Sequence, residues 1–123
     1  MHEFSMTSEI AKLVLDEAQN RGAKRVLEVN LVIGKLTFLG IEQIRFSYKL
    51  LSKGTILQGS KLKIERRDGM VECDKCGYKG PIKSQEDPFY HLSFPSLACP
   101  KCSSVVKVTE GRECTIKNIR LEV

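Results

Sequence analysis

Two pairs of cysteines constrain this chain more than any other feature of its sequence. Cys73 and Cys76 are separated by two residues, and Cys99 and Cys102 repeat that spacing after an intervening loop. Two residues between cysteines allow a tight turn that directs both sulfur atoms to one point, and two such turns supply the tetrahedral sulfur set that zinc prefers. The sequence therefore predicts a closed, structural four-cysteine zinc site, in which no ligand position is open for a substrate or a catalytic water.

The residues near the cysteines fit this interpretation. Gly77 follows the first pair and readily adopts the backbone angles that such a turn requires. The loop between the pairs contains Pro81, Pro88 and Pro95, which disfavour a helix or a central strand. Disulfides or a redox dithiol are the competing interpretation. A redox Cys-x-x-Cys usually occurs once, at the start of a helix in a βαβ unit, and neither condition holds here.

The size and composition of the chain are those of a small globular protein. It has 123 residues, of which 41% are hydrophobic and 28% charged, and it has no apolar run long enough to span a bilayer. The first residues lack a signal-peptide pattern, because Glu3 and Glu9 interrupt any apolar segment. We therefore expect a cytoplasmic protein with no membrane partner, and a reducing compartment favours zinc over disulfides.

The net charge of +5 raises the question of nucleic-acid binding. The twenty Lys and Arg residues are scattered, with adjacent pairs only at Lys24-Arg25 and Arg66-Arg67. A solvated basic surface explains this pattern, so we expect no nucleic-acid partner. A zinc-ribbon module that binds nucleic acid or a transcription complex is the alternative function, and strongly salt-dependent binding would favour it. No catalytic serine, histidine and carboxylate set or glycine-rich phosphate loop is apparent, and the sequence predicts no enzyme.

The spacing of hydrophobic residues predicts two helices. The first is expected to begin after Phe4, with Ser5 or Thr7 as its N-cap, and to end at Gly22. The second is expected to end at Gly54. The predicted core residues are Met6, Ile10, Leu13, Val14 and Ala18 in the first helix and Ile41, Ile44, Tyr48 and Leu51 in the second.

Alternating hydrophobic residues predict three strands, at residues 26–33, 60–67 and 114–123. The inward set of the third strand changes phase, which a bulge near Lys117 and Asn118 would explain. The fifth cysteine, Cys114, lies in this strand and is expected to be a small core residue. The predicted inward residues are Leu27, Val29, Leu31 and Ile33, then Leu62 and Ile64, then Cys114, Ile116, Ile119, Leu121 and Val123.

These elements predict an α+β fold: a small three-stranded sheet with two helices, plus an inserted four-cysteine zinc-ribbon-like domain. The last strand carries enough apolar residues to belong to the same core as the first two. We therefore assign residues 1–69 and 109–123 to one discontinuous domain and residues 70–108 to a zinc-binding domain.

The first three residues offer a second set of metal ligands. The α-amine of Met1 and the amide and imidazole of His2 can close fused chelate rings on one ion, and Glu3 adds an amide and a carboxylate. A nitrogen set that includes a deprotonated amide suits a square-planar ion such as Ni²⁺ or Cu²⁺. Taken alone, a terminal histidine is a weak signal, and a frayed chain end that happens to carry histidine is the more common explanation. His91, the other histidine, is expected to be a loop or packing residue, or else to complete the nickel sphere.

The order of these features resembles the HypA family of hydrogenase nickel-incorporation proteins over the whole chain. The resemblance implies a non-enzymatic nickel metallochaperone, with structural Zn²⁺ and transported Ni²⁺, whose discontinuous domain binds nickel. It implies His2 as the main nickel ligand, beside the Met1 amine and the backbone or side chain of Glu3, and it implies that the four paired cysteines hold zinc. The implied partners are a GTPase of the HypB type and the large subunit of [NiFe]-hydrogenase, with urease served in some organisms.

Overall fold

The computed structural model describes residues 2–81, 84–86, 93–95 and 99–123, and the chain forms two compact units. We call them the helix–sheet unit, which comprises Met1–Ile33, Phe38–Glu65 and Cys114–Val123, and the cysteine unit, which comprises Gly34–Thr37 and Arg66–Glu113. No helix among the described residues combines the length and the apolar composition that crossing a membrane requires.

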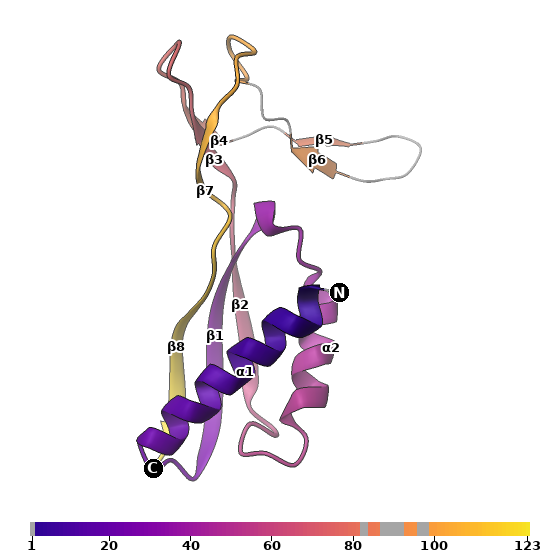
Figure 1. Ribbon diagram of the computed structural model, residues 1–123, viewed down its shortest axis with the longest axis vertical. Coiled ribbons are helices and arrows are strands. Elements are labelled where there is room, and N and C mark those ends of the chain that lie inside the picture. Colours follow the sequence, from indigo (N-terminus) through magenta and orange to yellow (C-terminus); the bar gives the residue numbers. More distant parts are fainter. Residues whose placement is uncertain (1, 82–83, 87–92, 96–98) are drawn as a thin grey trace. The chain divides into compact units, whose positions relative to one another are not determined.

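The elements of both units are labelled in Figure 1. The helices are α1 (His2–Asn20), the 3-10 helix η1 (Lys35–Thr37) and α2 (Ile41–Ser52). The strands are β1 (Arg25–Gly34), β2 (Lys61–Arg67), β3 (Met70–Glu72), β4 (Lys79–Pro81), β5 (Ser84–Glu86), β6 (Ser93–Pro95), β7 (Lys107–Glu110) and β8 (Cys114–Glu122). Their sheets have the orders β2-β1-β8, β4-β3-β7 and β5-β6. The first sheet, with α1 and α2, confirms the predicted α+β fold.

Helix α1 begins at His2, which is earlier than the sequence predicts. The expected N-caps, Ser5 and Thr7, both lie inside the helix. Thr7 is buried, and its Oγ1 donates a hydrogen bond of 2.6 Å to the carbonyl oxygen of Glu3. A hydroxyl that bonds back to the preceding turn of its own helix cannot cap the helix start. The prediction that the helix starts after Phe4 is therefore wrong.

The other end of α1 is the one predicted, a stop at Gly22. This residue has φ +63°, in the left-handed region that glycine adopts without strain. The Ala23 amide donates to the Ala18 carbonyl at 2.9 Å, and the Gly22 amide donates to the Gln19 carbonyl at 3.1 Å. These two bonds form a Schellman motif, which satisfies carbonyls that the helix end leaves unpaired.

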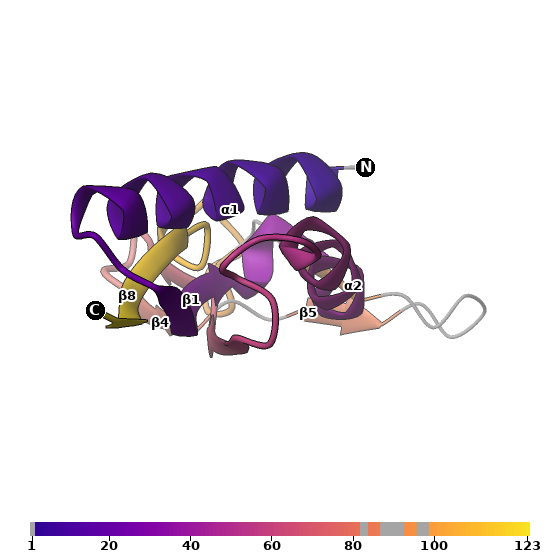
Figure 2. The ribbon, with the colours of Figure 1, turned by 90° about the horizontal axis from the view of Figure 1, so that it is seen from below.

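The core of the helix–sheet unit lies between the two helices and one face of the sheet. In Figures 1 and 2, α1 crosses the sheet diagonally and α2 lies on the β2 side. The predicted inward faces of α2 and β2 are confirmed. The prediction that Leu13 of α1 is a core residue is wrong, because this residue is 59% exposed. The buried cluster comprises Ile10, Ala11, Val14, Ala18, Val26, Val29, Leu31, Ile33, Ile44, Tyr48 and Leu57.

A bulge in β1 changes which residue faces this core near the start of the strand. Strand β1 pairs antiparallel with β8, and the register shifts between Val26 and Glu28, so that Leu27 has no partner. Val26 is 2% exposed and takes the core position that the sequence assigns to Leu27. The prediction for Leu27 is wrong because strict alternation cannot anticipate an extra residue.

A second irregularity lies in β8, where the sequence predicts one. Asn118 and Ile116 pair with consecutive residues of β1, and Lys117 between them has no partner. This confirms the predicted bulge and explains how the residues before and after it both face the core. The prediction that Val123 faces the core is wrong, because Val123 lies beyond β8 and is 77% exposed.

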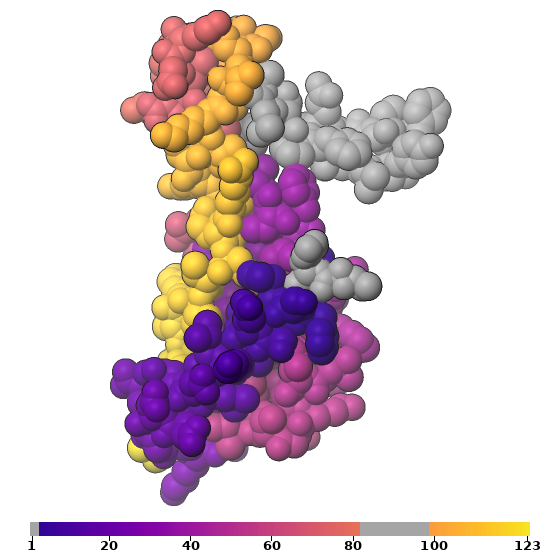
Figure 3. Space-filling view, viewed as in Figure 1, coloured from indigo at the N-terminus to yellow at the C-terminus, as the bar shows by residue number. Residues whose placement is uncertain are grey.

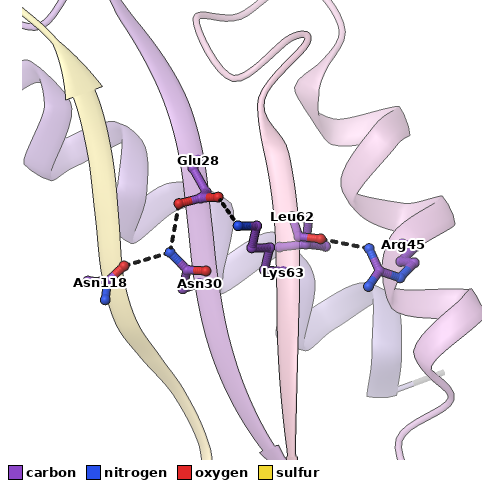
Figure 4. A network of polar contacts seen from close by, with 6 residues as sticks. All are labelled: Glu28, Asn30, Arg45, Leu62, Lys63 and Asn118. Carbon is purple, nitrogen blue, oxygen red and sulfur yellow. Dashed lines mark hydrogen bonds and ion pairs between the residues drawn. The ribbon is translucent and has the colours of Figure 1, made fainter.

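The opposite face of this sheet carries a polar network (Figure 4). Glu28 is only 8% exposed, and its Oε1 lies 2.8 Å from Nζ of Lys63 on the neighbouring strand. The Asn30 amide donates to Oε2 of Glu28 at 3.2 Å and to Oδ1 of Asn118 at 2.6 Å. The hydrogen bond from Lys63, followed by that from Asn30, holds the pKa of Glu28 below its ordinary value, against the effect of burial.

The cysteine unit contains a close crossing of backbone segments. The Gly34 amide donates to the Glu113 carbonyl and the Leu36 amide donates to the Gly111 carbonyl, both at 2.8 Å. A Cβ atom on Gly34 would lie 2.0 Å from the Gly111 carbonyl oxygen, and Gly111 itself has φ +110°. Glycine is required at both positions, at one for space and at the other for backbone conformation.

Candidate metal centre

The four predicted cysteines meet in the cysteine unit. Their sulfur atoms all lie within 4.8 Å of one another. The sulfurs of Cys73 and Cys102 are 3.5 Å apart, as are those of Cys76 and Cys99. A tetrahedral ion with Zn–S bonds of about 2.3 Å requires sulfurs about 3.8 Å apart, whereas a disulfide requires about 2.05 Å. The described cysteines are unpaired thiols, and their arrangement fits a tetrahedral metal ion.

Each cysteine pair forms the same backbone turn. The Cys73 carbonyl accepts a hydrogen bond from the Gly77 amide, and the Cys99 carbonyl accepts one from the Ser103 amide, both at 2.9 Å. Gly77 has φ +74°, as the sequence predicts, and Ser103 in the matching position has φ +62°. The left-handed conformation costs a residue with a side chain about 1–2 kcal/mol. The second turn therefore retains some strain that the first avoids.

Tyr78 and Lys101 connect the two turns. The Lys101 ammonium lies 5.8 Å from the centre of the Tyr78 ring, a cation–π distance, and the Tyr78 hydroxyl donates to the Pro81 carbonyl at 2.9 Å. The Lys101 amide also lies 3.4 Å from the Cys99 sulfur, to which it donates. Amide donors of this kind orient metal-bound thiolates.

The sulfurs affect one another's ionisation strongly. Hydrogen bonds from the side chain and the backbone of Ser104 lower the pKa of Cys102 to about 6. For Cys76, the backbone amide of Tyr78 favours the thiolate, but the contact with Cys99 and burial outweigh it and raise the pKa to about 12. Four negative charges this close repel one another, so full ionisation requires a cation among them. The chemistry of the donor set agrees with the geometry.

Of the predicted N-terminal ligands, His2 and Glu3 belong to the start of α1. Met1 and His91 lie outside the described residues, and for His2 the structure gives the backbone of the first helical position. Glu3 is described more fully, since its Oε2 accepts a hydrogen bond of 3.1 Å from the Gly40 amide. The nickel ligand set of Met1, His2 and Glu3 stays a prediction.

The first turn of α1 lies against α2, as the space-filling view shows (Figure 3). A hollow of about 340 Å³ opens there between the two helices. Its exposed apolar residues are Phe4 and Phe46, which are 49% and 65% exposed. The residues that line it are Glu3, Phe4, Glu42, Gln43, Phe46 and Ser47. The sequence does not indicate this surface, because each phenylalanine lies outside the predicted core faces.

A small α+β unit joined to a unit with four clustered thiols defines a metal-binding protein. The family model for hydrogenase/urease nickel incorporation, metallochaperone, HypA, matches residues 1–121. Hydrogenase maturation factor HypA from Methanopyrus kandleri is 41% identical over 134 aligned residues, covering 100% of this chain and 94% of the relative. Its counterpart from Methanothermobacter thermautotrophicus is 42% identical over 123 residues, covering 99% and 98%.

Solved structures agree in fold. A solution structure of HypA protein aligns with a TM-score of 0.68 at 20% identity, covering 98% of this chain and 96% of that one. The solution structure of the Ni metallochaperone HypA from Helicobacter pylori aligns with a TM-score of 0.63 at 19% identity, covering 98% and 97%. This chain belongs to the HypA family of nickel metallochaperones that act in hydrogenase maturation. The predicted family and the predicted function as a nickel metallochaperone are confirmed.

Proposed function

We propose that this chain carries Ni²⁺ at its N-terminus, on the α-amine of Met1, the amide and imidazole of His2, and Glu3, and delivers it for insertion into [NiFe]-hydrogenase. Membership of the HypA family supports nickel as the cargo. The observation that carries the location is the start of α1 at His2. It supports this location, because His2 and Glu3 lie in a helical first turn instead of a frayed chain end.

The first turn of a helix suits a ligand set that includes deprotonated amides. The first four amides of a helix have no acceptor within the helix, so the amides of His2 and Glu3 do not need to leave an intrahelical bond to bind a metal. The positive end of the helix dipole disfavours a bare cation but favours an ionised amide. Each deprotonated amide offsets one charge of Ni²⁺, and the resulting complex is compatible with the helix start.

We propose zinc as the resident ion of the four-cysteine cluster, held by Cys73, Cys76, Cys99 and Cys102. Its support is the all-sulfur donor set and the fit of the sulfur separations to a tetrahedron. An ion with four protein ligands has no open position, so its role is to stabilise the fold of the cysteine unit. On this proposal residues 70–108 are a zinc-binding domain, and residues 1–69 with 109–123 are the nickel-binding domain.

The proposed partners follow from the direction of nickel transfer. A GTPase of the HypB type would supply nickel or accept it, and the large subunit of [NiFe]-hydrogenase would be the final acceptor, with urease as a second acceptor in organisms that make it. We place this exchange in the cytoplasm and assign no catalytic step to the chain itself.

Calorimetric titration of nickel tests the terminal site. Three untagged zinc-loaded proteins are compared: the native sequence, a variant with Gly-Ser added before Met1, and His2→Ala. The extension converts the amine into an amide and moves the chelate off the chain end, so nickel binding should be lost in both variants. Zinc content should stay the same in all three proteins, because the cysteines lie far along the chain.

The pH dependence provides an independent check. The imidazole and the amine titrate near about 6.5 and 7.7 when unperturbed, and both must lose protons to bind nickel. Nickel should therefore dissociate as the pH falls from about 8 to 6. The terminal site is wrong if the extended protein binds nickel as tightly as the native one at pH 8.

A further inference from the structure

Glu3 accepts one hydrogen bond at its backbone carbonyl and another at its carboxylate. Its backbone carbonyl accepts from Oγ1 of Thr7 at 2.6 Å, and its carboxylate accepts from the backbone amide of Gly40 at 3.1 Å. Thr7 is 1% exposed, so the first of these bonds is shielded from water. The first turn of α1 is thus attached both to its own second turn and to the start of α2.

Gly40 is well suited to be the fixed end of the second bond. It is the N-cap of α2, with φ −75° and ψ 119°, and its side chain offers no cap. Its carbonyl accepts the first helical bond of α2, from Ile44 at 3.0 Å. Ile44 is buried in the core at 1% exposure. The Gly40 amide therefore has a direction set by α2 and the core, and the Glu3 carboxylate is fixed to it.

We propose that Gly40 and Thr7 are positioning residues for nickel, acting through Glu3. By holding this residue from the carbonyl and the carboxylate, they keep the first turn of α1 ordered before the metal arrives. The Glu3 carboxylate then serves as an anchor to α2, and Glu3 contributes to the metal through its backbone amide. Ordering a ligand set in advance strengthens binding, because less conformational freedom is lost on association. This inference rests on the proposed N-terminal nickel site.

Replacing Gly40 by proline removes the amide hydrogen with little change to the backbone conformation. Proline adopts φ near −65°, close to the −75° observed, and it has no N–H to donate to Glu3. Gly40→Ala is the matched reference, since it keeps the N–H. An added Cβ at this position would meet the end of the Gln43 side chain at 2.0 Å, so both variants displace the same flexible group.

Gly40→Pro should bind nickel about threefold to tenfold more weakly than Gly40→Ala, the range expected for loss of one ordinary intramolecular hydrogen bond. Calorimetry on the zinc-loaded full chains measures this ratio. Amide hydrogen exchange without nickel supplies a second readout, since the amide of Met6, which lies beyond the unpaired first amides of α1, should exchange faster in Gly40→Pro than in Gly40→Ala. Thr7→Val, which removes only the hydroxyl, should weaken nickel binding in the same direction. Equal affinities for the two Gly40 variants would overturn the proposal.

A double-mutant cycle tests whether Gly40 acts through the Glu3 carboxylate. If the carboxylate acts through Gly40, then Glu3→Ala combined with Gly40→Pro should bind nickel no more weakly than Glu3→Ala combined with Gly40→Ala. If the proline effect instead persists in the absence of the Glu3 carboxylate, Gly40 acts by another route, and the anchoring role is refuted. His2→Ala is titrated alongside: retained nickel binding in that variant contradicts the terminal site itself, which distinguishes the failure of the proposed function from the failure of this inference.

Discussion

The two units of this protein differ in what holds them together. Among the described residues, the helix–sheet unit buries a cluster of eleven residues contributed by α1, α2, β1 and the turn before β2. The buried cluster of the cysteine unit has four members, Val71, Cys73, Cys99 and Val106, and two of them are proposed metal ligands. Burying a large apolar side chain contributes about 1.5–3 kcal/mol. Two valines contribute too little to order a unit of this size, and on our proposal a metal ion replaces the missing core.

The largest effect is expected from a substitution that removes this metal ion. Cys73 is 1% exposed and is both a proposed ligand and a core residue, so Cys73→Ser should lose the metal and the ordered structure of the cysteine unit. Structural zinc contributes about 10–16 kcal/mol in small domains, far more than their other interactions supply. The helix–sheet unit should survive. Zinc content and two-dimensional NMR spectra measure the two units separately.

Cys114→Ser is the matched control for this experiment. Cys114 lies in β8, is partly buried against the helix–sheet core and takes no part in the four-sulfur cluster. The control should keep one zinc per chain and the native signals of Val71 and Val106. A Cys73→Ser protein with an ordered, metal-free cysteine unit would show that the comparison between the units is mistaken.

The second largest effect is expected from a substitution in the apolar core of the helix–sheet unit. Ile44 is 1% exposed at the centre of the helix–sheet unit, and Ile44→Ala should lower the free energy of unfolding by about 2–5 kcal/mol. Phe46→Ala on the exposed face of α2, where 65% of the side chain is accessible, should change it by less than about 1 kcal/mol. Urea unfolding followed by circular dichroism measures both. Zinc loss from Ile44→Ala would argue that the two units do not fold independently.

The sequence predicts the helix–sheet unit well because apolar burial produces periodic patterns. Spacing predicts the inward faces of α2 and β2 and the bulge at Lys117. The conformational freedom of glycine predicts the helix ends at Gly22 and Gly54. The errors at Leu27 and at the start of α1 come from features without a periodic signal. A bulge displaces one residue, and a buried threonine inside a helix looks the same in sequence as a threonine cap.

The cysteine unit is predictable in its ligands but not in its strands. Strands β3, β4 and β7 have three or four residues each, too few for alternation to be detected. The spacing of the cysteines, by contrast, is set by the geometry of the metal site and is visible directly. The contact between Glu3 and Gly40 joins residues 37 positions apart, and no local pattern indicates it.

The third effect tests whether anything besides metal supports the cysteine unit. Gly34→Ala places a Cβ 2.0 Å from the Gly111 carbonyl oxygen, which belongs to the backbone and cannot rotate away. We expect a loss of about 1–3 kcal/mol, typical of overpacking. Gly80→Ala is the control in the same unit, because its nearest obstacle is the movable Tyr78 hydroxyl at 2.9 Å. Equal urea midpoints for the two zinc-loaded variants would leave metal as the dominant support.

The smallest expected effect concerns the polar face of the helix–sheet unit. Lys63 and Asn30 hold the pKa of Glu28 below its ordinary value of 4.5, so the unfolded chain takes up this proton before the folded chain does as the pH falls. The contribution of Glu28 to stability is therefore complete above the unfolded pKa and is lost as the pH falls through the folded pKa. Glu28→Gln should flatten the decline of the melting temperature below about pH 5. Lys63→Met should flatten it similarly, since Lys63 is the largest cause of the shift. If both variants keep the full acid sensitivity of the native protein, this ion pair does not set the pH dependence, and other titratable groups do.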